Sequence, residues 1–347
     1  MKMNPLGRTG MTVSHLCLGT MTFSTQTPQK DAFVQMDTAL DHGVNFFDTA
    51  EMYPVNPKRA ETTGNTERVI GNWFQTSGRR DEVILATKHS GEGFSGARNG
   101  APITAQSIPE VVEGNLKRLR TDYIDLYQFH WPNRGSYMFR KNWTYDPSQQ
   151  DKAETLDNMA GCLEALQKLV DQGKIRAFGL SNESAWGTAQ WLRLAEDRAL
   201  PRVASIQNEY SLLCRLFDTD LAELSHNEDV GLLAFSPLAT GFLTGKYQGD
   251  AMPEGSRMTF GEGMGGRNTP RVRPAAEAYL QIAQRHGIDP VHLALAFCTS
   301  RPFMTSAIFG ATTQAQLEHV LSGADVVLTK DVLAEIDRAY RAHPMPF

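Results

Sequence analysis

The residues that could carry chemistry stand at the ends of three expected strands. Asp48 follows the apolar run V-N-F-F, Lys88 follows V-I-L-A-T, and His130 follows I-D-L-Y-Q-F. Tyr53 comes five residues after Asp48, on a loop that Pro54 takes out of regular structure. A lysine beside a tyrosine stabilises the phenolate and lowers the pKa of the phenol, and a carboxylate keeps the lysine charged. This set predicts a site that protonates an oxygen atom while another group attacks the adjacent carbon.

Each of these side chains has a simpler interpretation when taken alone. An aspartate at a strand end usually caps a helix or closes a turn, and a lone lysine there is usually solvated. A lone histidine is more often packed and hydrogen-bonded than catalytic, and a lone tyrosine is most often an amphipathic surface residue. Three ionisable residues that end three successive strands are much rarer by chance. The combination, rather than any one member, predicts the site.

Strands and helices alternate along the whole chain. Eight short apolar strands are expected, at 15–19, 44–48, 82–87, 123–129, 174–180, 202–207, 230–235 and 306–309. Helices are expected at 31–42, 66–74, 108–120, 156–172, 183–197, 217–226, 275–287, 290–298, 314–321 and 331–342. This order predicts a parallel sheet with helical crossovers. Eight units in 347 residues favour an α/β fold of the closed (β/α)8 TIM-barrel type, with all strand ends meeting at one mouth.

Three features complete the expected architecture. A β-hairpin is expected at 4–13, ahead of the first barrel strand. Long loops follow strands 2, 4 and 7, at 52–65, 131–153 and 246–274. Long loops inside a compact domain usually serve function, so we expect them to wall the site, with Met52, Trp131, Tyr137 and Phe139 as apolar contacts. Because no linker-like stretch divides the chain, one barrel domain is expected over residues 1–347.

Composition narrows the classes of partner. The chain is 41% hydrophobic and 21% charged, with a formal net charge of −5. The mild acidity argues against nucleic acid or an anionic membrane as partner. With no apolar run near 18 residues and no signal-like start, a cytoplasmic protein is expected. The four cysteines form no cluster, so we expect reduced thiols and no metal site; they are Cys17, Cys162, Cys214 and Cys298.

Two glycine-rich stretches do not predict a nucleotide site. Residues 91–96 and 261–266 both match G-x-G-x-x-G. Neither has the strand–turn–helix context of a Rossmann site. The sequence also contains no Walker A pattern and no H-E-x-x-H. The chemistry is therefore expected from an organic cofactor or from the side chains alone.

Asp48, Tyr53, Lys88 and His130 resemble the catalytic tetrad of the aldo-keto reductases. They stand in F-D-T-A-E-M-Y, A-T-K and Q-F-H-W-P. Other motifs of the family follow in order along essentially the whole chain, namely L-G-R-T-G, L-G-T-M-T-F, G-L-S-N-E, I-Q-N-E-Y and G-A-T-T-Q-A-Q-L. The branch that they resemble is that of the bacterial Tas-type reductases, which are related to the potassium-channel β subunits.

The resemblance implies a barrel that holds NADPH in an extended pose. Position by position, it implies cofactor contacts from Thr20, Met21, Ser181, Asn182, Gln207, Phe235, Ser236, Pro237, Leu238, Gly241, Lys246, Arg257, Gly310, Thr312 and Gln316. Residues 181, 182 and 207 would bind the nicotinamide carboxamide, and Phe235 would stack on the ring. The 236–246 segment would wrap the pyrophosphate.

The adenosine side is less defined. Arg257 resembles the cation that holds the adenosine phosphate, although Arg267, Arg271 and Arg273 lie in the same loop and compete for this role. Val320 stands where the family usually has asparagine. Selectivity for a 2′-phosphate needs a clustered or bidentate cation, so the preference for NADPH over NADH is left open.

The expected function is NADPH-dependent reduction of an aldehyde or ketone to an alcohol. Hydride would come from the nicotinamide and the proton from Tyr53, while Lys88 and Asp48 tune the phenol and His130 polarises the carbonyl. One alternative is an NADPH-binding sensor with negligible turnover, and another is a barrel isomerase or lyase that uses Tyr53 and Lys88 without redox chemistry. The expected partner is a small carbonyl compound, and both a monomer and a homo-oligomer remain open.

Overall fold

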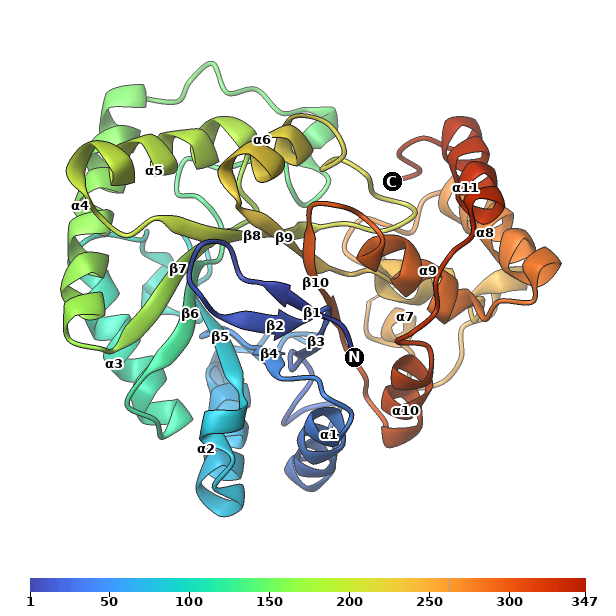
Figure 1. Cartoon of the computed structure of the whole chain (residues 1–347), viewed down its shortest axis with the longest axis horizontal. Coiled ribbons are helices and arrows are strands. Elements are labelled where there is room, and N and C mark those ends of the chain that lie inside the picture. Colours follow the sequence, from blue (N-terminus) through green and yellow to red (C-terminus); the bar gives the residue numbers. More distant parts are fainter. Residues whose placement is uncertain (262) are drawn as a thin grey trace.

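Eight parallel strands close into a barrel in a computed structural model that describes residues 1–261 and 263–347. Glu262, inside the second glycine-rich match, lies outside the described residues. The strand order is β10-β3-β4-β5-β6-β7-β8-β9 (Figure 1), which confirms the predicted (β/α)8 fold. The strands are β3 (Leu16–Gly19), β4 (Phe46–Asp48), β5 (Ile84–His89), β6 (Ile124–Phe129), β7 (Ile175–Ser181), β8 (Val203–Glu209), β9 (Gly231–Phe235) and β10 (Met304–Phe309).

Helices surround the barrel, as the alternating pattern predicts. They are α1 (Gln29–Asp41), α2 (Asn65–Ser77), α3 (Ser107–Leu119), α4 (Lys152–Asp171), α5 (Ala185–Arg198), α6 (Asp220–Glu228), α8 (Val272–His286), α9 (Pro290–Thr299), α10 (Gln314–Ser322) and α11 (Lys330–Ala342). In Figure 1 the orange and red helices α8 to α11 gather on one side of the barrel, beside β10.

Local signals set the helix boundaries. The Asp151 carboxylate accepts a hydrogen bond from the Glu154 backbone N–H at 2.9 Å and so caps α4. The C-terminal end of α8 is closed by Gly287, whose φ of 63° is the left-handed conformation that favours glycine. The expected helix start at Phe217 is wrong, because Asp218 accepts hydrogen bonds from the Tyr210 hydroxyl and the Arg215 guanidinium. These bonds hold a turn there, and α6 begins at Asp220.

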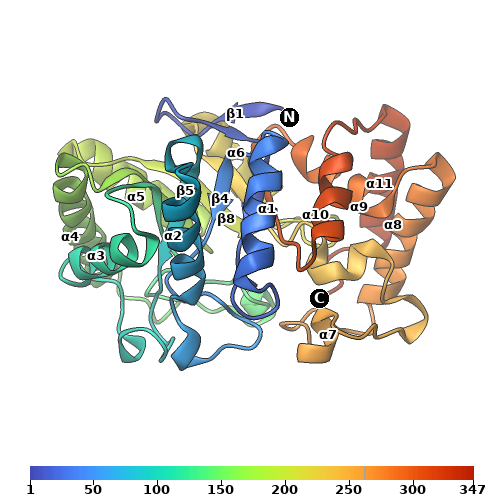
Figure 2. The ribbon, with the colours of Figure 1, turned by 90° about the horizontal axis from the view of Figure 1, so that it is seen from below.

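The predicted hairpin is confirmed, and it covers the amino end of the barrel. It consists of β1 (Met3–Pro5) and β2 (Thr12–Ser14), and Figure 2 shows it at the end of the molecule opposite α7 (Arg257–Phe260). Gly7 in its turn has φ +53°, and a Cβ there would lie 2.5 Å from the Ala204 carbonyl oxygen. The hairpin therefore packs against the barrel closely enough to require glycine.

Apolar side chains fill the inside of the barrel above the hairpin. This inner layer joins residues from the hairpin and from every barrel strand, namely Leu6, Val13, Cys17, Phe46, Ala86, Leu126, Ala177, Ala204, Leu233 and Ile308. All of them are at most 8% exposed. The lumen is a packed core and not a channel, as barrels of this size require.

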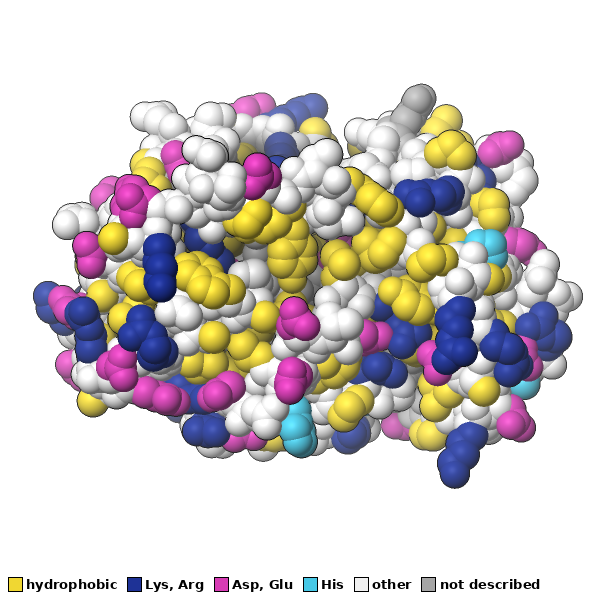
Figure 3. Space-filling model, turned by 90° about the horizontal axis from the view of Figure 1, so that it is seen from above, with side chains coloured by type: hydrophobic (Ala, Val, Ile, Leu, Met, Phe, Trp, Pro, Cys, Tyr) yellow, Lys and Arg dark blue, Asp and Glu magenta, His cyan; other side chains and the backbone are white. Residues whose placement is uncertain are grey.

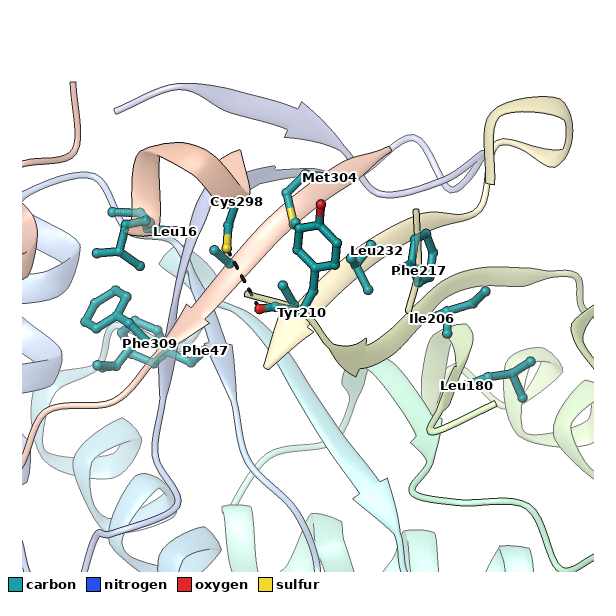
Figure 4. Close-up of a cluster of buried hydrophobic side chains, with 14 of the residues drawn as sticks. Leu16, Phe47, Leu180, Ile206, Tyr210, Phe217, Leu232, Cys298, Met304 and Phe309 are labelled. Carbon is teal, nitrogen blue, oxygen red and sulfur yellow. Dashed lines mark hydrogen bonds between the residues drawn. The ribbon is translucent and has the colours of Figure 1, made fainter. Parts of the chain in front are cut away.

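A larger core lies between the barrel and the helices. Figure 4 shows part of it, with Leu16, Phe47 and Ile206 pointing away from the lumen. The Cys298 thiol donates to the Tyr210 carbonyl oxygen across 3.8 Å. All four cysteines are buried and unpaired, so they serve as small apolar residues.

The long loops at the mouth contain short helical pieces that the sequence did not predict. These are η1 (Ala60–Thr62), η4 (Lys141–Trp143), η6 (Gln248–Asp250) and α7, and a further piece, η5 (Ala239–Thr244), lies between β9 and the third long loop. Inside η5, Thr240 and Gly241 have φ of 57° and 103°. These positive values interrupt any regular helical period, so no apolar periodicity could reveal the segment.

The surface shows mixed charge on the side that Figure 3 presents. Lysine and arginine alternate there with aspartate and glutamate, and hydrophobic side chains lie between them. Within residues 1–261 and 263–347, no helix is both long and apolar enough to cross a membrane.

Candidate active site

A buried ion pair stands at the carboxyl end of the barrel. Asp48 ends β4, and Lys88 lies near the end of the neighbouring β5. The Lys88 ammonium donates to Asp48 Oδ2 at 2.6 Å and to the Thr49 carbonyl oxygen at 2.7 Å. Lys88 is fully buried and Asp48 is 3% exposed. Removing one partner from such a pair leaves an uncompensated buried charge, so each residue depends on the other.

Two glutamines complete the shell of Asp48. Gln207 Nε2 donates to Asp48 Oδ1 at 2.8 Å, and Gln128 Nε2 reaches the same oxygen at 3.3 Å. Both carboxylate oxygens are therefore satisfied, which is what a buried ionic network requires. Gln128 was not predicted from the sequence. A signal was present, because an amide two residues before His130 on a buried strand faces the same way as that histidine.

Tyr53 lies over this pair at the edge of the mouth. The Lys88 ammonium is 5.0 Å from the centre of the Tyr53 ring, and the His130 ring meets it edge-on at 5.8 Å between centroids. Tyr53 packs against Met52 and Trp131 in a small apolar cluster while remaining partly exposed. The structure thus brings all four residues of the predicted tetrad together.

Burial sets the protonation of these groups. It raises the pKa of the Tyr53 phenol, and the opposing charge of Lys88 does not cancel the effect. The pKa lowering that the sequence predicted is therefore wrong, because desolvation outweighs the lysine. Burial alone would lower the pKa of Lys88, but Asp48 and Tyr53 raise it above its usual value. Burial, assisted by Lys88, lowers the pKa of His130 far below its usual range. At neutral pH the tyrosine keeps its proton, the lysine is charged and the histidine is neutral.

The ends of β7 and β8 hold the residues predicted to bind the nicotinamide. The Ser181 hydroxyl donates to the Gln207 carbonyl oxygen at 2.8 Å, and Asn182 Nδ2 donates to the His130 carbonyl oxygen at 2.8 Å. Asn182 Oδ1 and His130 Nδ1 are buried without a hydrogen-bond partner in the part of the chain that the structure describes. Buried polar atoms without partners are rare, and a bound polar group would account for both.

The predicted pyrophosphate segment forms a tight turn after β9. Ser236 has φ 56°, and with Gly241 at 103° it curls the backbone into a concave turn, the type that presents N–H groups to anions. A Cβ on Gly241 would lie 2.7 Å from Lys246 Cε, so glycine lets the lysine cross the turn. Phe235, Ser236 and Leu238 are half-buried, while Pro237 is buried.

Thr20 and Met21 follow the end of β3 and lie next to the Asp48–Lys88 pair. The Thr20 N–H and hydroxyl both donate to the Asp48 carbonyl oxygen, at 3.0 and 2.8 Å. Met21 packs on the apolar cluster that contains Tyr53. Thr20 thus holds the end of β4 in place, a role that the sequence did not predict.

In the segment after β10, two of the residues predicted to bind the cofactor are hydrogen-bonded to each other. Gln316 Oε1 accepts hydrogen bonds from the Thr312 backbone N–H at 2.9 Å and from the Thr312 hydroxyl at 3.0 Å. Gly310 is exposed, and a Cβ there would meet nothing closer than the Gly19 carbonyl oxygen at 3.8 Å. The three predicted contacts therefore share one surface turn at the start of α10.

Arg257 differs from the three arginines that compete with it. Arg267 pairs with Glu209 at 2.8 Å, Arg273 pairs with Asp250 at 3.3 Å, and Arg271 lies over the Trp143 ring at 5.0 Å.

Among residues 1–261 and 263–347, by contrast, Arg257 has no hydrogen bond or ion pair. Burial, together with the charge of Arg267, lowers the pKa of Arg257 to about 10. A half-buried guanidinium without a side-chain partner is suited to an anionic ligand.

Three glutamates at the mouth fasten the surrounding loops, and we call Glu51, Glu183 and Glu209 the mouth glutamates. All three are at most 8% exposed. The arginine partners come from distant loops: Arg98 binds Glu51, Arg134 binds Glu183, and Arg140 and Arg267 both bind Glu209. Opposing arginine charge outweighs burial and lowers the pKa of Glu51 and of Glu209.

These anchors were not predicted from the sequence. A signal was available, because each mouth glutamate stands at or shortly after the end of a strand, inside F-D-T-A-E-M-Y, G-L-S-N-E or I-Q-N-E-Y.

A cavity of about 560 Å³ lies beside the mouth. Its walls include Trp131 and Ser181 together with Phe129 and Trp191. Of the apolar contacts expected from the long loops, Met52 and Trp131 pack with Tyr53, whereas Phe139 is 51% exposed.

A sequence model described as "Aldo/keto reductase family" matches residues 15–341. "Protein tas" of Escherichia coli (strain K12) is 42% identical over 352 aligned residues, which cover 100% of this chain and 99% of that protein. The "Uncharacterized oxidoreductase YrpG" of Bacillus subtilis is 33% identical, with 94% and 92% covered. A "Probable voltage-gated potassium channel subunit beta" of Arabidopsis thaliana is 31% identical, with 99% and 98% covered.

Proposed function

We propose, since the chain belongs to the aldo/keto reductase family, that it reduces an aldehyde or ketone to an alcohol with NADPH. Oxidoreductase activity in general follows from the family. The carbonyl substrate, the NADPH and the roles of individual residues are our proposal. The substrate is a small molecule, and we assign the whole chain, 1–347, to one barrel domain.

The arrangement of Tyr53 over the Asp48–Lys88 pair carries the proposal. In the reaction, the Tyr53 hydroxyl gives its proton to the carbonyl oxygen as the carbonyl carbon gains a hydride. The Lys88 ammonium stabilises the phenolate that remains, and Asp48 keeps Lys88 charged in its dry surroundings. Water then reprotonates Tyr53. One proton and one hydride have been added across the C=O bond, which converts the carbonyl compound into an alcohol.

His130 orients the substrate. Its lowered pKa keeps the imidazole neutral, so it can donate a hydrogen bond to the carbonyl oxygen without competing as an acid. Met52 and Trp131 supply apolar surface around the same spot. Together they present the carbonyl oxygen to the Tyr53 hydroxyl and exclude water around it.

Three features of the described residues fit a nicotinamide dinucleotide. The unpartnered Asn182 Oδ1 can accept from a carboxamide N–H. The turn from Ser236 to Gly241 has the concave backbone that binds phosphate oxygens. Arg257 is a half-buried cation without a side-chain partner among the described residues, close enough to Tyr53 for their charges to interact, and an anionic group of the cofactor would compensate its charge. When bound, NADPH supplies the hydride.

The test follows NADPH oxidation with a panel of aromatic aldehydes and methylglyoxal. We expect oxidation with at least one carbonyl compound and slower oxidation of NADH. A fluorescence titration of NADPH, run alongside, measures binding separately. Tight binding without oxidation of any carbonyl in the panel contradicts the reductase, and no binding at all contradicts the cofactor as well.

A second candidate is a nucleotide-sensing subunit. The observation that favours it is the similarity to proteins named as potassium channel β subunits, which extends over nearly the full length of both chains. Such a protein would bind NADPH and turn over negligibly. The complete set of Tyr53, Lys88, Asp48 and His130 favours the reductase, because a sensor does not need a proton donor.

A further inference from the structure

Two histidines and an aspartate meet on the surface between α9 and α10. Asp289 precedes α9, His292 lies in its first turn, and His319 lies on α10. Each side chain offers a nitrogen or oxygen atom, and these atoms all lie within 4.8 Å of one another. His319 Nε2 is 3.1 Å from Asp289 Oδ1, and the two imidazole rings stack with centroids 4.9 Å apart. None of these residues takes part in the proposed reduction.

The His292 ring is held in one orientation. Its Nε2 is 2.7 Å from the His319 carbonyl oxygen, to which it can donate, and this leaves the lone pair on Nδ1. Histidine ligands of metals typically donate their other ring N–H to a backbone carbonyl in this way. Gly323 lies against the ring, where a Cβ would approach His292 Cδ2 to 2.1 Å. Its φ of −100° does not require glycine, so the residue serves to make room for the imidazole.

We propose that His292, His319 and Asp289 bind a late first-row divalent cation of the Zn²⁺ type. Two imidazoles and one carboxylate form a donor set that such ions prefer. Ligands at about 2.1 Å from a metal lie about 3.0 to 3.4 Å apart when they subtend adjacent angles, and the His319–Asp289 separation of 3.1 Å has this length. The cation would replace the proton that His319 Nε2 and Asp289 Oδ1 share in the hydrogen bond.

The remaining coordination positions go to water. Asp289 and His292 are half-buried and His319 is exposed, so solvent reaches the cluster. The ion would join the first turn of α9 to α10 as a structural cross-link. The sequence predicted no metal site, because residues 289, 292 and 319 match no short motif and only the packing of α9 on α10 brings them together.

The test is a calorimetric titration of the full chain with Zn²⁺ alone, after removal of any histidine tag. We expect one ion per chain at micromolar concentration. His292→Gln and His319→Gln should each weaken Zn²⁺ binding about tenfold or more. Asp289 Oδ1 also caps α9, because it accepts hydrogen bonds from the backbone N–H groups of Val291 at 2.8 Å and His292 at 3.3 Å. Asp289→Asn should weaken Zn²⁺ binding while keeping this cap, since asparagine caps as well as aspartate does.

His286→Gln is the matched control. His286 is also a surface histidine beside a carboxylate, at 3.0 Å from Glu335, but it has no second imidazole in the described groups of potential ligands. Its loss should leave the affinity for Zn²⁺ unchanged. A circular dichroism melt without metal checks that each variant folds.

Two results would overturn the proposal. One is no Zn²⁺ binding to the wild-type chain, which would make the cluster a helix cap and helix contact only. The other is binding that survives in both His292→Gln and His319→Gln. Visible absorption of bound Co²⁺ gives a second readout, since tetrahedral nitrogen and oxygen ligation absorbs far more strongly than hydrated Co²⁺.

Discussion

The two ends of the barrel are built from the same strands but from opposite kinds of residue. Phe46, Ala86 and Leu126 face the lumen in the apolar layer near the hairpin. Two residues further along the same strands come Asp48, Lys88 and Gln128, which form the buried polar network. Since successive residues of a strand alternate between faces, a step of two keeps the direction and changes only the depth. A step of two residues along each strand therefore separates the apolar layer, which stabilises the fold, from the polar network, which carries the proposed reaction.

The two ends should therefore respond differently to mutation. Burial of apolar area at the amino end contributes stability directly. At the carboxyl end, a buried ion pair contributes little net stability but is costly to break. Mutations at the first end should change stability alone, while those at the second should change turnover as well.

Lys88→Met should have the largest effect. It leaves Asp48 buried without its cation, which costs about 3–5 kcal/mol of unfolding free energy, and it removes the group that stabilises the Tyr53 phenolate. We expect a much lower midpoint in urea and loss of carbonyl reduction. Lys174→Met is the matched control, because Lys174 pairs with Glu113 on the surface and should change stability by at most about 1 kcal/mol. Equal effects of the two mutations would contradict the assignment.

Leu6→Ala should reduce stability without reducing turnover. Leu6 is fully buried in the inner layer, and loss of such a side chain costs about 2–5 kcal/mol. Urea unfolding measures this cost, and kcat should remain at the wild-type value, because the apolar layer with Phe46, Ala86 and Leu126 lies between the hairpin and the mouth network. A fall in kcat that parallels the loss of stability would show that the two ends are not separable.

The stability of the fold should depend on pH through buried histidines at the carboxyl end of the barrel. Burial, with the charge of Arg98, lowers the pKa of His89 on β5 from 6.5 to about 4. Between these values the unfolded chain binds a proton that the folded chain does not, so stability falls as the pH falls from 6.5 to about 4. The shift corresponds to up to about 3 kcal/mol. His130 acts in the same direction.

The change is measured by urea unfolding at several pH values. His89→Gln should flatten the curve between pH 6.5 and 4, whereas Leu6→Ala should only displace it. An unchanged slope in His89→Gln would contradict the role of this histidine.

The sequence predicted the barrel because its signals are local and repeated. Each strand is a short apolar run, and each is followed by a helical period, so the order of elements alone indicated the topology. The hairpin was predicted for the same reason. Its place across the amino end of the barrel was not, since nothing local reveals that Gly7 lies against Ala204.

The site was predictable only in part. Strand ends meet at one mouth, so Asp48, Lys88 and His130 could be brought together from their positions. The hydrogen bonds of Gln128 and Gln207 to Asp48 span 80 and 159 residues. Strand periodicity indicates which way these side chains face, but it does not indicate that they bond to Asp48. The sign of the Tyr53 pKa shift was missed because it depends on how far the loop around Met52 and Trp131 buries the phenol.

Turnover of Tyr53→Phe at saturating NADPH tests the central claim most directly. The mutation removes only the hydroxyl, so the ring keeps its packing beside Lys88 and His130 and NADPH binding should stay within about twofold of wild type. Because the variant lacks the proton donor, its kcat for carbonyl reduction should fall by about 10²–10⁴-fold. A kcat near the wild-type value, with the protein folded and NADPH bound, would contradict Tyr53 as the proton donor.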